Sequence, residues 1–229
     1  MVPRTGNAAA DMMTESMVVA PSLSLRHQLQ WWRKVMHMTT GAIGFFLYGH
    51  LGWDRSTMIV VTGVAVVMAL GLEWWRRNHA DVNDRLCRWF ACCMREHERW
   101  ECSSATWYLL SMWGVFLCCP RAVALLTLWF VAFGDTAAGI VGSRWGRHRV
   151  TRHVSLEGAA AAFAVCALGG WILAPTLVLD GDVVIRAWFA LMGGLIGMMA
   201  EGAFHLWDDN LSIPLFSAPL LWGLTTLFA

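Results

Sequence analysis

Apolar residues in this chain gather in seven long runs, and the short segments between them carry most of the charged side chains. A straight transmembrane helix needs about 20 apolar residues, and several of these runs are shorter. Their glycine and proline breaks predict helices that are interrupted or that cross only in part. We therefore predict an all-α, polytopic membrane bundle of about seven transmembrane helices. The expected spans cover about residues 38–53, 57–75, 104–119, 122–141, 155–174, 183–204 and 211–228.

The composition supports a membrane protein. Hydrophobic residues make up 57% of the 229 residues and charged residues 14%, whereas a soluble domain carries about 25% charged residues. Fifteen tryptophans are also present, and this residue favours membrane interfaces. The net charge of +1 does not indicate a partner. We expect a bilayer environment and no nucleic-acid partner.

Two segments differ from the apolar spans. Residues 1–25 are small and polar, carry no evident cleavable signal, and are predicted to be a disordered tail before one membrane-embedded domain, residues 26–229. Residues 76–103 are rich in both charge signs. Within them Leu86, Phe90 and Cys93 recur at helical spacing together with Trp89. This pattern predicts an amphipathic helix on the membrane surface.

The positive charges predict the orientation. The N-terminal segment holds four lysines and arginines, and the successive connections hold one, six, one, four, one and none. Because cytoplasmic segments are rich in lysine and arginine, we expect a cytoplasmic N-terminus. The connections 76–103, 142–154 and 205–210 then fall on the same side. This face would hold the polar groups Arg33, Lys34, His37, Glu73, Arg95, Glu96, Asp135, Glu157, Glu201, Asp208, Asp209 and Asn210.

Asp135 is the most unusual of these groups. It lies inside an apolar span, where a carboxylate is costly and indicates function. Small residues at 134, 138 and 142 repeat every fourth position, which allows a second helix to approach closely. The alternative interpretation is helix packing around a buried, paired aspartate.

Further oxygen ligands stand at the start of the last span. Asp208, Asp209 and Asn210 follow one another there. Mg²⁺ is typically held by one or two carboxylates and by substrate phosphate oxygens. We therefore expect a magnesium site at Asp135, Asp208 and Asp209. The alternative for residues 208–210 is a solvated turn or a helix N-cap.

The loop between Asp135 and Glu157 is basic. Guanidinium groups bind phosphates, often through two hydrogen bonds, so this loop is a candidate phosphate site. Ser155 with Glu157 could instead form only the N-terminal cap of the next helix. No P-loop motif is present. The arginines of the loop are Arg144, Arg147, Arg149 and Arg152.

Several short motifs appear in a fixed order between about residues 30 and 220. They are Arg33-Lys34-x-x-His37, Met94-Arg95-Glu96-x-Glu98, Trp107-Tyr108-Leu109-Leu110, Gly134-Asp135-Thr136-Ala137-Ala138-x-x-x-Gly142-x-x-x-Gly146, Ser155-x-Glu157-Gly158, and Glu201 followed by Asp208-Asp209-Asn210-Leu211-x-Ile213-Pro214-Leu215. Together they resemble the polyprenol and diacylglycerol kinase group, which comprises dolichol kinase, phytol kinase and the CTP-dependent diacylglycerol kinase. The segment 94–98 is most similar to the diacylglycerol kinase branch.

The resemblance implies phosphoryl transfer from CTP to a lipid hydroxyl at the cytoplasmic face of the endoplasmic reticulum membrane, with Mg²⁺. Diacylglycerol is the expected acceptor, with dolichol or phytol as alternatives. Asp135, Asp208 and Asp209 would hold the metal, and Glu157 or Asp209 would accept the hydroxyl proton. The nucleotide and phosphate set would comprise Arg33, Lys34, His37, Arg95, Thr136, the four loop arginines, Ser155, Gly158 and Asn210, with Glu73, Glu96 and Glu201 as further candidates.

Three alternative functions stay open at this point. A phosphatidate cytidylyltransferase also uses CTP and a lipid, but its usual C-terminal signature is absent. An ion-coupled transporter could use Asp135, but no internal repeat is evident. An inactive membrane scaffold is the third, because Val154 stands where relatives usually carry lysine.

Overall fold

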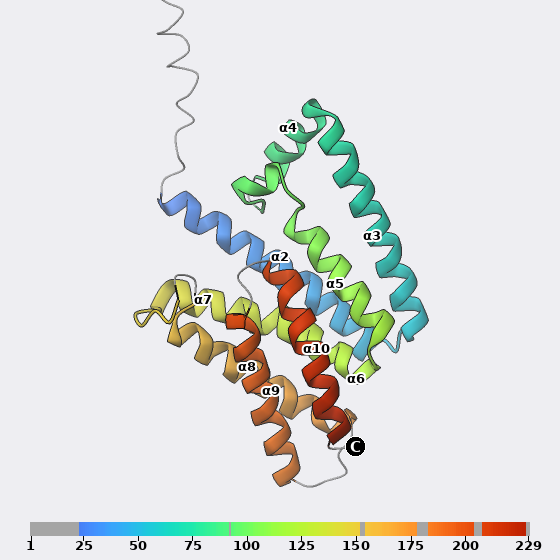
Figure 1. Cartoon of the computed structure of the whole chain (residues 1–229), viewed down its shortest axis with the longest axis vertical. Helices are drawn as coiled ribbons and strands as arrows, with labels where there is room; N and C mark the ends of the chain where they lie inside the picture. Colours follow the sequence, from blue (N-terminus) through green and yellow to red (C-terminus); the bar gives the residue numbers. More distant parts are fainter. Residues whose placement is uncertain (1–22, 92, 152–153, 178–182, 204–207, 228–229) are drawn as a thin grey trace, which may run out of the picture.

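The computed structural model describes residues 23–91, 93–151, 154–177, 183–203 and 208–227, and every element within these ranges is helical (Figure 1). This confirms the predicted all-α class. The predicted tail, residues 1–25, lies almost entirely outside the described ranges. The elements are α2 (Leu23–Gly49), α3 (Arg55–Asn78), α4 (Ala80–Trp89), η1 (Glu96–Arg99), α5 (Ser104–Cys118), α6 (Arg121–Trp129), η2 (Phe130–Asp135), α7 (Thr136–Trp145), α8 (Leu156–Leu177), α9 (Val183–Ala203) and α10 (Asp209–Leu227).

A helical segment occupies each of the seven predicted spans. Four segments are long and apolar enough to cross a membrane, namely α3, the continuous segment α6–η2–α7, α8 and α9. Helix α5 has only 15 residues, and α2 and α10 are not among the four. The helices therefore confirm a membrane bundle, while the number of seven crossings stays a prediction.

Local sequence explains where the helices begin. The Asp54 and Ser103 side chains accept hydrogen bonds from the backbone N–H groups of Thr57 and Thr106, which caps α3 and α5. Pro120 lies between α5, which ends at Cys118, and α6, which begins at Arg121. Its ring prevents a continuous helix through this point.

The prolines inside helices correct one prediction. We expected Pro175 to end the fifth span after residue 174, but α8 continues to Leu177. Pro214 and Pro219 likewise lie inside α10. Pro175 lies close to the end of α8, so few helical hydrogen bonds depend on its position.

The segment α6–η2–α7 forms the centre of the bundle. Val123, Leu126 and Thr127 on α6 and Phe130 and Val131 on η2 are almost fully buried. Helices α2, α8 and α10 pack around this segment. The hydrophobic core therefore surrounds the span that leads to Asp135.

The small residues around Asp135 do bring two helices together. A Cβ atom on Gly158 would lie 2.8 Å from the Ala138 carbonyl oxygen and 3.2 Å from the Cα atom of Gly142. A Cβ atom on Gly134 would lie 2.6 Å from Sγ of Cys166. The predicted small-residue repeat is therefore the contact surface between η2–α7 and α8.

The predicted surface helix within 76–103 is shorter than its apolar pattern. Helix α4 ends at Trp89, whose side chain is 76% exposed. Phe90 and Cys93 follow in the turn after α4 and still line the same cavity as Leu86. Leu86 and Cys93 are half-buried and Phe90 is exposed, so the apolar positions share a cavity wall, although a turn replaces the last part of the helix. The location of this segment on the membrane surface stays a prediction.

The helix ends divide into two sets in space. The start of α2, helix α4 and the α7–α8 loop lie along the upper and left side of Figure 1, and α10 begins near the middle. The α2–α3 and α5–α6 connections and the end of α10 lie along the lower and right side. The side of the membrane that each set faces stays a prediction.

Candidate active site

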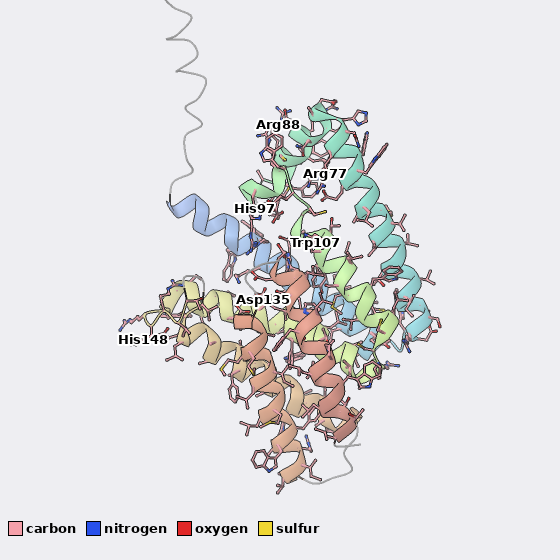
Figure 2. The ribbon with its side chains drawn as sticks, viewed as in Figure 1. Arg77, Arg88, His97, Trp107, Asp135 and His148 are labelled. Atoms are coloured by element: carbon pink, nitrogen blue, oxygen red, sulfur yellow. The ribbon has the colours of Figure 1, made fainter. Side chains whose placement is uncertain are left out.

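A small polar recess opens where four segments meet on the side of the bundle that carries the basic loops. Helix α2 provides three side chains, the segment before η1 provides one, η2 provides one, and α10 provides two. Asp135 lies near the middle of the molecule, where these segments converge (Figure 2). The residues that line the recess are Arg33, Lys34, His37, Arg95, Asp135, Asp209 and Asn210.

Asp135 closes a π-helical turn, Phe130–Asp135, between α6 and α7. Such turns insert one extra residue into a helix and are frequent at functional sites. Nζ of Lys34 donates a hydrogen bond of 3.5 Å to the backbone carbonyl of Asp135. Lys34 passes directly over Gly139, where a Cβ atom would lie 1.5 Å from Nζ. The glycine therefore makes room for a lysine beside Asp135.

Thr136 directly follows Asp135 but is not among the residues that line the recess. Its side chain is buried, and Oγ1 makes no hydrogen bond with another described residue. A buried hydroxyl is usually hydrogen-bonded. The ligand-binding role of Thr136 stays a prediction.

Asp208 joins the recess to the segment 95–104. Its Oδ2 lies 2.8 Å from Oγ of Ser104 and 3.6 Å from Nη1 of Arg95. Oγ of Ser104 also lies 2.6 Å from Oε1 of Glu98, so this hydroxyl can donate to only one of the two carboxylates at a time. The Oδ1 atom of Asp208 accepts from the backbone N–H of Asn210, which caps α10.

Asp209 and Asn210 differ in what they contact. Oδ2 of Asp209 lies 3.7 Å from Nη2 of Arg95, and half of its side chain is exposed. Asn210 is buried, its side chain donates to the Ser104 carbonyl at 3.3 Å, and its backbone carbonyl accepts from the Ser111 hydroxyl at 2.7 Å. Asp209 therefore presents a carboxylate to the recess, whereas Asn210 joins α10 to α5.

The recess brings both charge signs together. Its lining includes two carboxylates, Asp135 and Asp209, and three cations, Arg33, Lys34 and Arg95. The carboxylates favour a bound metal ion, and the cations favour the phosphates that would accompany it.

These residues fit a magnesium ion that arrives with a nucleotide. Among the described residues, no three histidine, cysteine or acidic side chains lie close enough to enclose a metal ion. Mg²⁺ usually binds through one or two carboxylates and completes its coordination with waters and phosphate oxygens. Asp135 and Asp209 line one recess and could supply that pair of carboxylates.

The structure does not bring Glu157 into the recess. Oε1 of Glu157 lies 2.8 Å from Nδ1 of His148, and both carboxylate oxygens accept from the His148 backbone N–H at 3.3 Å. His148 lies at the far left of the molecule, well away from Asp135 (Figure 2). Glu157 therefore stabilises the α7–α8 loop.

Ser155 and Gly158 also have local structural contacts. Oγ of Ser155 accepts from the Gly158 backbone N–H at 3.1 Å, which caps α8. Gly158 packs against α7, as described above. Val154, the departure from the family pattern, pairs with Val150 through its backbone in the same loop. A lysine is nevertheless present in the recess, because Lys34 enters it from α2.

The loop arginines are exposed. Arg144 lies over the Trp145 ring at 5.3 Å, and Arg147 and Arg149 also extend into solvent. Arg152 lies outside the described residues. The described arginines of the predicted phosphate-binding loop are therefore not among the residues that line the recess.

Glu73 and Glu96 are two of the further candidate site residues, and Glu73 is not among the residues that line the recess. Glu73 is buried in a separate cluster with Arg76. Glu96 begins η1, but its side chain is not among those that the structure describes.

Two residues of the polar network were missing from the predicted set. These are Glu98, only 2% exposed, and Ser104, whose hydroxyl contacts both Glu98 and Asp208. Glu98 belongs to the motif 94–98, so its acidic type within that motif was a usable signal. Ser104 offered no such signal, since serines commonly begin helices.

Comparison with known proteins identifies three similar fungal proteins, each named CTP-dependent diacylglycerol kinase 1. The protein of Schizosaccharomyces pombe is 28% identical over 209 residues, which cover 87% of this chain and 94% of that protein. The protein of Saccharomyces cerevisiae is 28% identical over 204 residues, covering 81% of this chain and 70% of that protein. The protein of Eremothecium gossypii is 30% identical over 204 residues, covering 81% and 64%.

No protein-family model matches the chain, and no solved structure matches it. The similarity to the three kinases nevertheless covers 81% to 87% of the chain. Over most of its length the chain is similar to proteins named as CTP-dependent diacylglycerol kinases, which supports the family that the motifs indicate.

Proposed function

We propose that this protein is a CTP-dependent lipid kinase that phosphorylates the free hydroxyl of diacylglycerol to give phosphatidate. The observation that carries this proposal is the recess in which Asp135 and Asp209 face Arg33, Lys34 and Arg95. The similarity to three CTP-dependent diacylglycerol kinases supports the same reaction. We further propose that it works at the cytoplasmic face of the endoplasmic reticulum membrane.

Asp135 and Asp209 would hold Mg²⁺ together with the nucleotide phosphates. The ion supplies charge stabilisation for the phosphates and needs no other protein ligand. Asp208 is less available, because Ser104, Arg95 and the α10 backbone already contact its two oxygens. Asp208 would therefore position Arg95 and Asp209.

The cations of the recess would neutralise the triphosphate. Arg33 and Lys34 lie on one turn of α2, and Arg95 enters from the opposite side. Charge stabilisation and alignment supply most of the catalysis in phosphoryl transfer. The exposed arginines at the end of α7 would attract the nucleotide before it enters the recess.

Asp209 is our candidate for the general base. It would accept the proton of the lipid hydroxyl as the hydroxyl oxygen forms a bond to the γ-phosphorus. The bond between this phosphorus and the β,γ-bridging oxygen would break, and CDP would leave. Asp209 is better placed than Glu157 for this role, because Asp209 lines the recess and Glu157 contacts His148.

The test is a lipid kinase assay on detergent-purified protein with Mg²⁺ and γ-labelled CTP. Diacylglycerol, dolichol and phytol are supplied separately, and we expect label in phosphatidate. Asp135→Asn should lower the rate by about 1,000-fold, the scale for loss of one major electrostatic group. Asp54→Asn is the matched control, because Asp54 caps α3 at the other end of the bundle.

Two results would contradict the proposal. One is the absence of label in every lipid, and the other is full activity of the Asp135→Asn protein. Label that reaches lipid from the α position of CTP would instead indicate cytidylyl transfer.

A further inference from the structure

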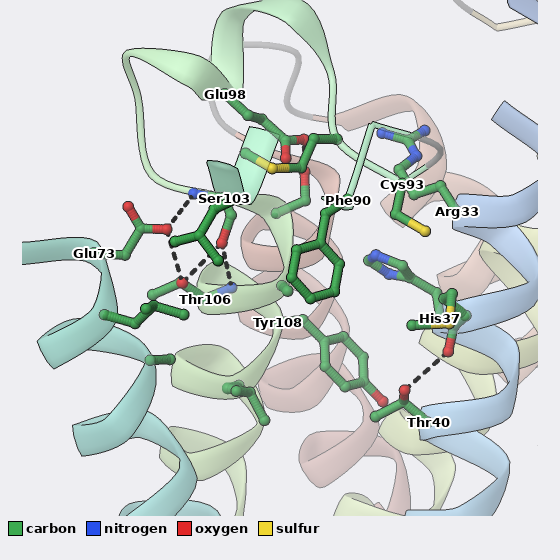
Figure 3. Close-up of a pocket in the computed structure, with 18 of the residues that line it drawn as sticks. Arg33, His37, Thr40, Glu73, Phe90, Cys93, Glu98, Ser103, Thr106 and Tyr108 are labelled. Atoms are coloured by element: carbon green, nitrogen blue, oxygen red, sulfur yellow. Dashed lines mark hydrogen bonds between the residues drawn. The ribbon is translucent and has the colours of Figure 1, made fainter. Parts of the chain in front are cut away.

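A second cavity lies beside the polar recess and has a different character. It is enclosed by α2, α3, α4 and α5 and has a volume of about 370 Å³ (Figure 3). Much of its wall is apolar, with Leu72 from α3, Leu86 from α4, Phe90 from the turn after α4, and Leu109 from α5. Cavities of this size and character hold part of an apolar ligand.

The apolar cavity adjoins the recess through shared residues. Arg33 and His37 line both spaces. Ser104 also lines the cavity, and its hydroxyl contacts Asp208 of the polar network. A ligand in the cavity could therefore place a polar end against the groups that would bind the phosphates.

Tyr108 supplies an independent sign that the ligand has a polar group. Its side chain is buried and lines the cavity, yet Oη makes no hydrogen bond with another described residue. The ring packs edge-on against His37, with 5.6 Å between ring centroids. Figure 3 shows the ring between Phe90 and α2. A buried hydroxyl without a partner is unfavourable, so a ligand acceptor would satisfy it.

We propose that this cavity binds the glycerol backbone and the adjoining acyl segment of diacylglycerol, with Oη of Tyr108 donating a hydrogen bond to an ester carbonyl. The proposal rests on the proposed function and adds a binding site and a basis for selectivity. The free hydroxyl of the lipid would point past His37 toward Asp209. Isoprenoid alcohols carry no ester carbonyl, so Tyr108 would favour diacylglycerol over them.

The cavity holds only part of such a lipid, and the remaining acyl chains would extend into the bilayer. Helix α3 has its main contacts with α4 and α5. Its outer face carries Val67 and Met68, each 70% exposed. Lipid chains would therefore lie next to the helix that forms one wall of the cavity.

The first experiment compares a diester with a diether substrate. Tyr108→Phe should lower kcat/KM for diacylglycerol about tenfold, the scale for one lost hydrogen bond. It should leave kcat/KM unchanged for a 1,2-di-O-alkylglycerol, which has no ester carbonyl. Tyr48→Phe is the matched control at the chain's other tyrosine and should alter neither value. An equal loss with both lipids, or no loss with either, would overturn the role of Tyr108.

The second experiment measures binding without phosphoryl transfer. Diacylglycerol with a photoreactive group near the start of one acyl chain is crosslinked in the absence of CTP. We expect label in residues 86–94 and 104–109. Ala69→Trp, which fills the cavity, should remove this label, whereas Val67→Trp on the outer face of the same helix should not.

The two experiments separate the cavity from the reaction. Crosslinking at the cavity without any phosphorylation would leave the binding site in place and contradict the kinase proposal. Full kinase activity of Ala69→Trp, or label confined to other helices, would overturn the cavity assignment and leave the kinase proposal intact.

Discussion

Two polar clusters lie toward the same side of the helix bundle, one around Glu73 and Arg76 and the other around Asp135 and Asp209. In the first, Nε of Arg76 donates to Oε2 of Glu73 at 2.8 Å. Oε1 of Glu73 accepts from the Ser103 backbone N–H at 3.0 Å and lies 3.3 Å from the Thr106 hydroxyl. Both carboxylate oxygens are therefore occupied.

Arg76 is equally well satisfied. Its Nη1 donates to Asn83 at 3.1 Å and to the Arg99 carbonyl at 3.2 Å, and its Nη2 donates to the Glu101 carbonyl. These bonds join α3 to α4, η1 and the start of α5. A buried ion pair with every group satisfied holds structure together and has no capacity left for a ligand.

The Asp135 cluster has the opposite property. The Asp135 carboxylate makes no hydrogen bond or ion pair with another side chain in the described ranges. Arg95 approaches Asp208 and Asp209 only at 3.6 and 3.7 Å. Thr136 and Tyr108 hold unpartnered hydroxyls beside this region. Unused hydrogen-bonding capacity, rather than the number of charges, distinguishes the candidate active site from the scaffold.

The largest expected effect concerns the scaffold. Glu73→Ala should destabilise the folded protein by about 3–5 kcal/mol, because it leaves the buried Arg76 without its charge partner. Thermal unfolding in detergent measures this change. Arg77→Ala is the control, since Arg77 is 45% exposed at 3.6 Å from Glu73 and should cost less than about 1 kcal/mol. Equal destabilisation by the two variants would refute the distinction between the clusters.

Asp209→Asn should lower the reaction rate without lowering stability, in contrast to Glu73→Ala. We expect kcat to fall about 100-fold with an unchanged unfolding temperature, because the side chain acts in the reaction and is half-exposed. The Mg²⁺ concentration needed for half-maximal rate should rise. Asp208→Ala provides the contrast, since losing the α10 cap should also lower stability by about 1 kcal/mol. A lower unfolding temperature for Asp209→Asn would place it with the scaffold.

Lys34 can be removed from the recess in two ways. Lys34→Met should raise the KM for CTP about tenfold through loss of one charge-assisted contact. Gly139→Ala should produce a similar rise, because the new Cβ atom would occupy the position of Nζ of Lys34. Gly71→Ala is the control, at a helical glycine with open space around it. A normal KM for Gly139→Ala would show that Lys34 binds CTP from another position.

The smallest effect is expected at Glu157. Glu157→Gln weakens its contact with His148 and leaves the recess untouched, so kcat/KM should change less than about twofold. The assay with γ-labelled CTP measures this change in kcat/KM. A loss as large as that of Asp209→Asn would restore Glu157 as the general base and require the α7–α8 loop to move.

The sequence by itself determined the membrane class and the positions of the seven apolar helices, and it identified Asp135 as the leading candidate site residue. These follow from local properties, because the length of an apolar run and the cost of a carboxylate within it do not depend on distant residues. The motif order also indicated the family, which the similar proteins support.

Only the tertiary structure decided which charged groups meet. Asp208 contacts Ser104 across 104 positions of the chain, and Lys34 reaches Asp135 across 101. Glu73 and Glu157 looked equivalent to these acids along the sequence, but each has a partner close to it in the chain. Pairing depends on which helix ends pack together, and packing also created the π turn at Asp135 and the buried, unpartnered hydroxyl of Tyr108.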